Sequence, residues 1–176
     1  AEGLVDSAVF FQTQSSMLDV VYTILARGDV GSARAWFERL TAGAEPEDPQ
    51  SLAAARTVEA LLLRAEGATC KALGLAELAF AQRDRNAITT QHSKMAAEEM
   101  LECALELGER AKAEELLTVL DGLRPAELTP VYRGLRGRFR GRLAAGPAAW
   151  AHFLEAEAAY EGLGATFHLA VTRLEH

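Results

Sequence analysis

Apolar residues recur every three or four positions along most of the chain, and short polar turns separate the runs. Such spacing places side chains on one face of an α-helix. Runs of Val, Ile, Thr and aromatic residues, which would indicate strands, are absent. The pattern therefore predicts an all-α protein. One stripe, which includes a single serine, runs through Leu4, Ala8, Phe11, Ser15, Leu18, Tyr22 and Leu25.

Capping residues, prolines and glycines mark where the helices begin and end. Asp48 and Thr129 each precede a proline and predict a helix start, and Gly146 before Pro147 does so with a weaker cap. A glycine after a helical run suits the left-handed residue that ends a helix. Longer helices are expected over about 4–27, 49–66, 88–107 and 130–145, and a ninth helix near Ala165. The predicted left-handed glycines are Gly28, Gly43, Gly67, Gly108, Gly122 and Gly162.

The glycine turns repeat at a nearly constant interval. Those at Gly28, Gly67, Gly108 and Gly146 are 39, 41 and 38 residues apart, and a shorter helix follows each. Each shorter helix carries a small residue with apolar or small ones four and seven positions later. Such spacing lets two helices approach closely and pack. The four sets are Ala33/Phe37/Leu40, Ala72/Ala76/Ala79, Ala113/Leu117/Leu120 and Ala149/Phe153/Ala156.

Helix pairs that repeat every 35 to 45 residues indicate an α-solenoid, in which neighbouring pairs bury one another's apolar faces. We therefore expect a single domain over 1–176 with about four antiparallel helix pairs. A plain helical bundle, or three repeats and a cap, remain alternatives. The expected repeats cover about 1–45, 46–86, 87–124 and 125–163, and a further helix starts in 164–176.

The segment GPAAWAHFLEAEAAYEG, 146–162, resembles the second helix of a tetratricopeptide (TPR) repeat. The segment AAYEGLGATFHLAVTRLEH contains the phrase large apolar-x-x-Leu-Gly-Ala from Tyr160 to Ala165. It resembles helical repeats of large bacterial signalling proteins, either ATPase-linked transcription regulators of the maltose-activator type or cyclase/ATPase/TPR proteins. The resemblance implies a right-handed superhelix that serves as a sensor or scaffold, while chemistry resides in other domains.

Composition and charge narrow the class of partner. Of 176 residues, 49% are hydrophobic. The net charge of −7 argues against general binding to nucleic acid or anionic membranes. No apolar run approaches the roughly 20 residues that span a bilayer, and no secretory leader opens the chain. Cys70 and Cys103 are expected to be reduced, buried thiols of a cytoplasmic protein. Both termini interrupt helical patterns and predict an excised piece of a larger protein, although Leu174-Glu175-His176 could begin a vector-derived tag.

No reaction-site motif occurs in the sequence. The P-loop pattern, G-x-G-x-x-G after a strand, G-x-S-x-G and H-E-x-x-H are all missing. No histidine follows a glutamate by three residues, and neither cysteine has the close Cys or His neighbour that a zinc site needs. We therefore expect no catalytic, cofactor-binding or metal-ligating residue and no enzymatic activity.

The basic stretch from Arg124 to Arg142 is the candidate partner-binding region, with six arginines and one glutamate. On a helix, Val131, Leu135, Phe139 and Leu143 form a buried stripe, while Arg133, Arg136 and Arg140 share another face. Guanidinium groups bind carboxylates and phosphates through paired hydrogen bonds, so this face could hold an acidic partner. The alternative is a solvated face paired with the acidic helix 98–109, and a nucleic-acid partner is the least favoured interpretation.

Three further features favour structural over functional interpretations. Each glycine inside a helix destabilises it by about 1 kcal/mol relative to Ala. The presence of Gly134, Gly137 and Gly141 in one helix therefore indicates close packing against a neighbouring helix, with a ligand groove as the alternative. Trp36 and Trp150 are expected in the core between helices. The acidic run is expected to be a solvated surface and comprises Glu98, Glu99, Glu102, Glu106 and Glu109.

Together these observations predict a non-catalytic module that binds a protein or peptide partner, or senses an effector, in a bacterial signalling regulator. Other domains of the same polypeptide could be the partner. The alternative is a self-associating spacer, or a free-standing TPR adaptor, whose exposed repeat ends stack on other surfaces.

Overall fold

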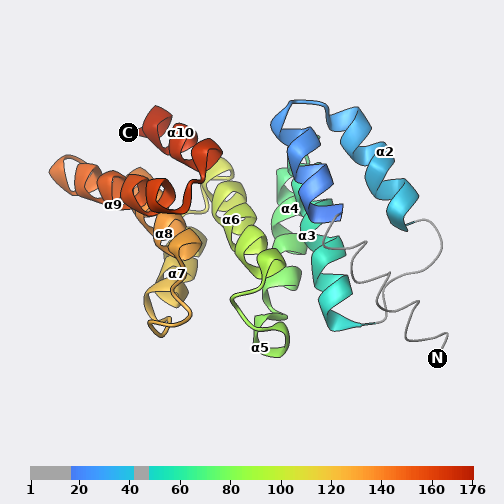
Figure 1. The fold of residues 1–176 in the computed structure, drawn as a ribbon, viewed down its shortest axis with the longest axis horizontal. Helices are drawn as coiled ribbons and strands as arrows, with labels where there is room; N and C mark the ends of the chain where they lie inside the picture. Colours follow the sequence, from blue (N-terminus) through green and yellow to red (C-terminus); the bar gives the residue numbers. More distant parts are fainter. Residues whose placement is uncertain (1–16, 42–47) are drawn as a thin grey trace. The chain divides into compact units, whose positions relative to one another are not determined.

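The computed structural model describes residues 17–41 and 48–176, and within these ranges the only regular secondary structure is helical (Figure 1). The all-α prediction is confirmed. Residues 17–26 form the first described helical segment. The helices that follow are α2 (Val30–Thr41), α3 (Pro49–Ala65), α4 (Thr69–Phe80), α5 (Arg83–Asn86), α6 (Gln91–Glu106), α7 (Arg110–Asp121), α8 (Pro130–Leu143), α9 (Pro147–Leu163) and α10 (Thr166–Glu175).

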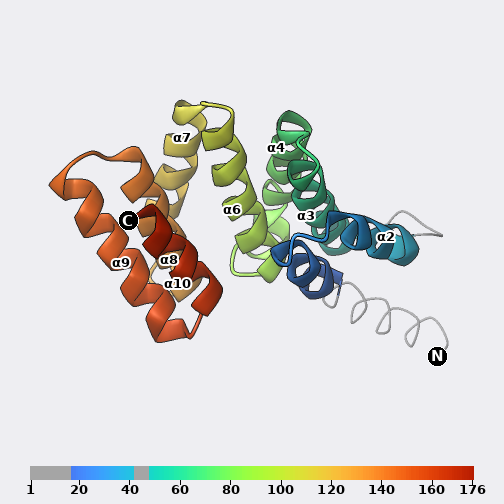
Figure 2. The same cartoon turned by 90° about the horizontal axis from the view of Figure 1, so that it is seen from above.

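The described chain forms two compact units that meet in sequence between Leu107 and Gly108. This boundary falls inside the predicted third repeat, 87–124, between its two helices. In the first unit α3 packs against α2, α4 and α6, and α4 also packs against α6. Figures 1 and 2 both show α3 and α4 side by side. In the second unit α8 packs against α7 and α9, and α10 packs against α9.

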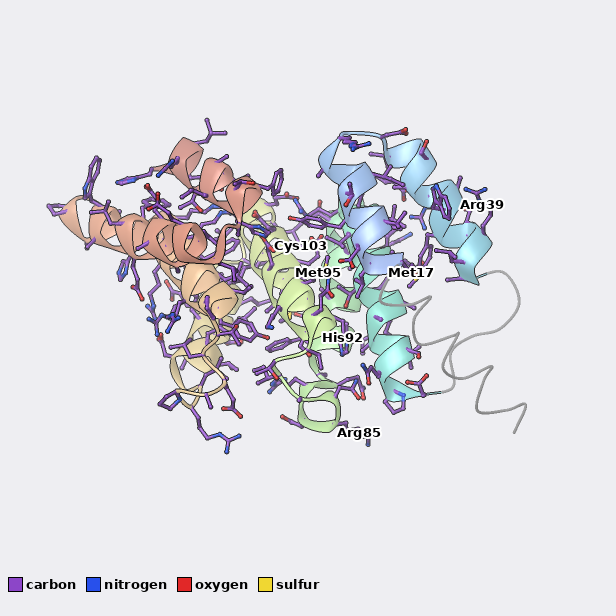
Figure 3. All side chains as sticks on the ribbon, in the orientation of Figure 1. Met17, Arg39, Arg85, His92, Met95 and Cys103 are labelled. Atoms are coloured by element: carbon purple, nitrogen blue, oxygen red, sulfur yellow. The ribbon has the colours of Figure 1, made fainter. Side chains whose placement is uncertain are left out.

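The core of the first unit joins several helices through apolar side chains. Met17 and Val21 from the first helical segment meet Phe37 of α2 and Val58 of α3, with Met95 of α6 packed against them (Figure 3). A second cluster joins α4 to α6. It contains Ala72, Leu73 and Cys103, with Leu63 and Met100 at its edge.

The core of the second unit lies between α8 and α9. Tyr132, Leu135 and Phe139 of α8 are completely buried, whereas Val131 and Leu143 of the predicted stripe are only partly buried. The facing residues of α9 are Phe153, Ala156 and Tyr160. Figure 2 shows α10 beside α9. Because the buried side chains of α8 and α9 face one another, these two helices form the centre of the second unit.

The predicted helix starts are confirmed. The Asp48 carboxylate accepts a hydrogen bond of 2.9 Å from the Ser51 amide at the start of α3. The Thr129 hydroxyl caps α8 in the same way, through the Tyr132 amide. Both cap residues have extended backbones and precede a proline at the first helical position.

The predicted helix ends are correct in part. Gly28, Gly67 and Gly108 have positive φ angles, as expected. Gly122 ends α7 as predicted, but its φ of −76° shows that it is not in the left-handed conformation that was expected. Gly162 was wrongly predicted, because α9 continues through it and Gly164, with φ of 70°, ends the helix. Gly43 and the first part of the predicted helix 4–27 lie outside the described residues.

Two predictions about side-chain burial are wrong. Trp36 and Trp150 are 40% and 59% exposed, so neither belongs to the core. Trp36 instead lies 4.4 Å beneath the Arg39 guanidinium, and Trp150 meets the ring of His176 edge-on. Cys103 is buried as expected, whereas Cys70 is exposed. Among the described residues, no helix combines the length and apolar character that crossing a lipid bilayer requires.

Candidate functional site

The three candidate arginines of α8 have different surroundings. Arg133 is exposed and makes no ion pair with any described residue. Arg136 contacts Glu155 of α9 at 2.5 Å and Asp121 of α7 at 3.9 Å, and Arg140 pairs with the same aspartate. Two of the three arginines therefore link α8 to its neighbours within the second unit.

The glycines of α8 allow α9 to approach closely. A Cβ atom added at Gly137 would lie 2.8 Å from the His152 carbonyl oxygen and 2.9 Å from the Ala156 amide nitrogen. A Cβ at Gly141 would meet the Phe153 ring at 2.8 Å, and one at Gly134 would overlap the Tyr160 ring. Real Cβ atoms do not occupy such positions, so the glycines serve helix packing. The space that a ligand groove would need is filled by α9.

Arg138, also on α8, is only 4% exposed. Its guanidinium donates from Nε and Nη2 to the two carboxylate oxygens of Glu175, both at 2.7 Å, and lies 4.9 Å from the Phe139 ring centre. A paired, hydrogen-bonded geometry of this kind is what a buried charge requires. The charge pattern of α8 does not separate Arg138 from its exposed neighbours, so the sequence alone did not predict its role.

A polar cleft of about 340 Å³ lies between α7, α8 and α9. Arg110 crosses one side of it, where its Nε donates to Glu114 at 3.0 Å and its Nη2 donates to the Leu143 carbonyl. Arg140, from the predicted arginine face, and the half-buried His152 also line the cleft. The remaining lining residues are Leu117, Thr118 and Ala144.

The cleft thus brings one of the three predicted site residues together with two residues that the sequence did not indicate. Arg110 and His152 lie 30 and 12 positions from Arg140 in the sequence. No local spacing connects them, because helix packing brings them together. Two guanidinium groups and an imidazole can donate hydrogen bonds to an anionic group, and Leu117 and Leu143 supply apolar walls.

The first unit contains a second polar cluster, around Glu99. This carboxylate is 1% exposed and accepts a hydrogen bond of 2.7 Å from Arg64 Nε, with the Cys103 thiol 3.5 Å from the same oxygen. Arg64 also donates from Nη1 to Glu106 at 3.0 Å, and the Thr69 hydroxyl donates to that glutamate at 3.2 Å. The prediction of a solvated acidic surface is therefore wrong for Glu99.

Burial dominates the protonation of this cluster. It raises the pKa of the Glu99 carboxyl, although the Arg64 guanidinium opposes the shift. Burial also raises the pKa of the Cys103 thiol, and the Glu99 carboxylate adds to that effect. A thiol held in its protonated form is a poor nucleophile. The cluster thus has the character of a structural link between α3, α4 and α6.

No group of three or more His, Cys, Asp and Glu side chains with the geometry to hold a metal ion occurs in residues 17–41 and 48–176. Comparison with known proteins gives no relative, since no family model, no curated protein and no solved structure matches the chain.

Proposed function

We propose that this chain is a TPR-like helical-repeat module that binds a protein or peptide partner, or senses an effector, without catalysing a reaction. The observation that carries the proposal is a set of large apolar side chains exposed on α9 and α10. Trp150, Leu154, Phe167 and Leu174 are between 48% and 88% exposed. Exposed apolar surface of this kind is typical of sites that other protein surfaces cover.

The packing of the helices supports the repeat interpretation. In the first unit α3 contacts α4 within its predicted pair, α4 contacts α6 of the next pair, and α3 contacts α6 directly. Contacts within a pair, between pairs and between first helices are what stacked helix hairpins produce. In the second unit α7, α8, α9 and α10 contact one another in chain order. The proposed arrangement is a right-handed solenoid of about four pairs.

One observation departs from the simple repeat. The second helix of the fourth pair, α9, has 17 residues, whereas its first helix, α8, has 14. α9 also carries apolar residues on its exposed surface, including Ala151, Leu154 and Ala158, together with the exposed Glu155 and Glu161. Exposed apolar side chains that gather in this way are typical of a surface that another protein covers. This exposed surface is therefore the one that we expect a partner to cover.

Capture experiments with matched variants test the proposal. The double variant Trp150→Ser/Leu154→Ser should lose partners that the unchanged chain retains, whereas Leu78→Ser, at a 50% exposed position in the first unit, should retain them. Circular dichroism checks that the variants keep their helical content. Retention of the same partners by the double variant and the unchanged chain would contradict the assignment of this surface.

The alternative is a self-associating spacer, or a free-standing adaptor. The same exposed side chains would then bind a second copy of the chain or another repeat. Sedimentation velocity distinguishes self-association from binding to a different partner. Self-association gives an apparent mass that rises with concentration, and the double variant should abolish that rise. A monomer at all concentrations favours binding to a different partner.

We also propose the bacterial signalling context and cytoplasmic location expected from the sequence. Cys70 and Cys103 are both free thiols, and free thiols are typical of a reducing compartment. Membership of a signalling or transcription regulator rests on the resemblance of the last repeat. Sequencing the reading frame on both sides of this segment tests it, because an ATPase, cyclase or DNA-binding domain should lie beside the repeats.

A further inference from the structure

We propose that the cleft between α7, α8 and α9 binds a phosphate group, such as that of a phosphomonoester, through Arg110, Arg140 and His152. The inference goes beyond the proposed function and does not rest on it, since phosphate binding can occur whether or not the chain captures a protein. The volume of about 340 Å³ is large enough for a small ligand.

The donors in the cleft are only partly used. A guanidinium carries five N–H groups. Arg110 uses its Nε and Nη2 for Glu114 and the Leu143 carbonyl, and Arg140 uses its Nη2 for Asp121. The remaining N–H groups of both arginines have no acceptor among the described residues. The bonds already made fix the direction of each guanidinium and so reduce the entropy lost on binding.

His152 adds a third donor to the cleft. Its imidazole is half-buried and makes no hydrogen bond with any described residue. A half-buried ring without such a bond is available to a ligand, and a neutral imidazole can present one N–H group. The three donors come from three helices, Arg110 from α7, Arg140 from α8 and His152 from α9.

This arrangement favours phosphate over other ligands. A phosphomonoester presents three terminal oxygens, one for each donor, whereas a carboxylate presents two. Two guanidinium groups disfavour a cation, and the only carboxylate in the lining, Glu114, is already bonded to Arg110. The side chains of Leu117 and Leu143 can contact the carbon atoms of the ester.

Glu114 makes the proposal specific. Its carboxylate orients Arg110, but it also repels an anion in the cleft. Replacing Glu114 by glutamine keeps an acceptor for Arg110 and removes the negative charge. Glu114→Gln should therefore bind phosphate more tightly, whereas Arg140→Gln should bind it more weakly.

The experiment follows the ring signals of His152 by NMR during titration with inorganic phosphate and with glycerol 3-phosphate, at fixed pH and ionic strength. We expect a saturable shift, weakened about tenfold by Arg140→Gln and strengthened by Glu114→Gln. Arg124→Gln is the matched control, because it removes a charge from an exposed arginine of the same unit outside the cleft. Its affinity should stay within about twofold of the unchanged chain.

Three results would overturn the proposal. The first is the absence of a saturable shift of His152. The second is an equal loss of affinity in Arg124→Gln and Arg140→Gln, which would mean general attraction by charge. The third is equal binding of acetate, which would exclude selectivity for phosphate. If Arg140→Gln fails to fold, Glu114→Gln still decides, since unchanged or weaker binding in that variant contradicts the assigned geometry.

Discussion

Arg64 Nε donates a hydrogen bond of 2.7 Å to the carboxylate of Glu99, which is almost completely buried 35 residues further along the chain. Arg64 itself is 31% exposed, so water reaches one partner of the pair and not the other. The carboxylate lies in the contact between α3 and α6. Its position makes the packing of these two helices dependent on a charge.

The first prediction concerns removal of the cation alone. Arg64→Leu leaves the buried Glu99 carboxylate without its guanidinium and should lower the free energy of unfolding by about 2–3 kcal/mol, less than for a fully buried pair because Arg64 is partly exposed. Urea unfolding measures the change. The double variant Arg64→Leu/Glu99→Leu should recover much of the loss, because it buries apolar groups instead of an unpaired charge.

The pH dependence of the same variant follows from the raised pKa of Glu99. A carboxyl group with a raised pKa in the folded state favours folding below its unfolded pKa, and that contribution is lost as pH rises through the folded value. The deficit of Arg64→Leu should therefore be smaller at pH 5 than at pH 7. An equal deficit at both pH values would mean that Glu99 is not the group responsible. Arg124→Leu, at an exposed ion pair with Glu127, should leave the stability nearly unchanged.

The second prediction concerns His92, near the start of α6 (Figure 3). Its ring is 4% exposed, with Nε2 3.1 Å from the Thr90 hydroxyl, and burial lowers its pKa. Because the folded state favours the neutral ring, the contribution of His92 is present above its ordinary pKa of 6.5 and is lost as pH falls below it. Thermal unfolding between pH 7.5 and pH 5 should show stability falling with pH, and His92→Gln should flatten that slope.

If His92→Gln has the same slope as the unchanged chain, the burial of a neutral His92 ring does not control stability in this range.

The third prediction concerns the cap of α3. Asp48→Ala removes the acceptor for the Ser51 amide and should cost about 1 kcal/mol of stability, whereas Asp48→Asn keeps an acceptor and should cost only a few tenths. Burial raises the pKa of Asp48, but hydrogen bonds from the Ser51 side chain and from the backbone at the start of α3 together outweigh it and lower that pKa. The contribution of the aspartate is therefore present above pH 3.8 and is lost as pH falls through its folded pKa. Urea unfolding at pH 7 and pH 3 measures both effects, and an asparagine variant with the same pH dependence as the unchanged chain would exclude this role.

Local signals in the sequence were sufficient to predict much of the fold. A cap followed by proline marks the start of a helix because both act within one turn, and Asp48 and Thr129 behave as expected. The backbone conformations of Gly122 and Gly162 could not be predicted from such local signals. A glycine after a helical run is compatible with several backbone conformations, and only the packing of the neighbouring segments selects among them.

The candidate sites depend on contacts between distant residues and were harder to predict. Five glutamates at helical spacing in and beside α6 look equivalent in sequence, yet only Glu99 among them is fully buried, because its side of the helix meets Arg64. The arginine face of α8 was predicted as a face, but its acidic neighbours Asp121 and Glu155 follow from the packing of α7 and α9. The exposure of Trp150 could not be predicted for the same reason. Whether an apolar side chain is buried depends on which helices pack against it.

The last prediction tests how closely α8 and α9 pack. A Cβ atom at Gly137 would lie within 2.9 Å of two backbone atoms of α9, and backbone cannot yield as a flexible side chain can. Gly137→Ala should therefore destabilise the second unit by about 3 kcal/mol, near the upper end for overpacking. Gly74 lies inside α4 with no atom within 4 Å of an added Cβ, so Gly74→Ala should stabilise the protein by about 0.5–1 kcal/mol. Because both substitutions add the same methyl group to a helix, opposite signs in urea unfolding would assign the difference to the contact with α9. A stabilising Gly137→Ala would mean that α8 and α9 are further apart than their glycines require.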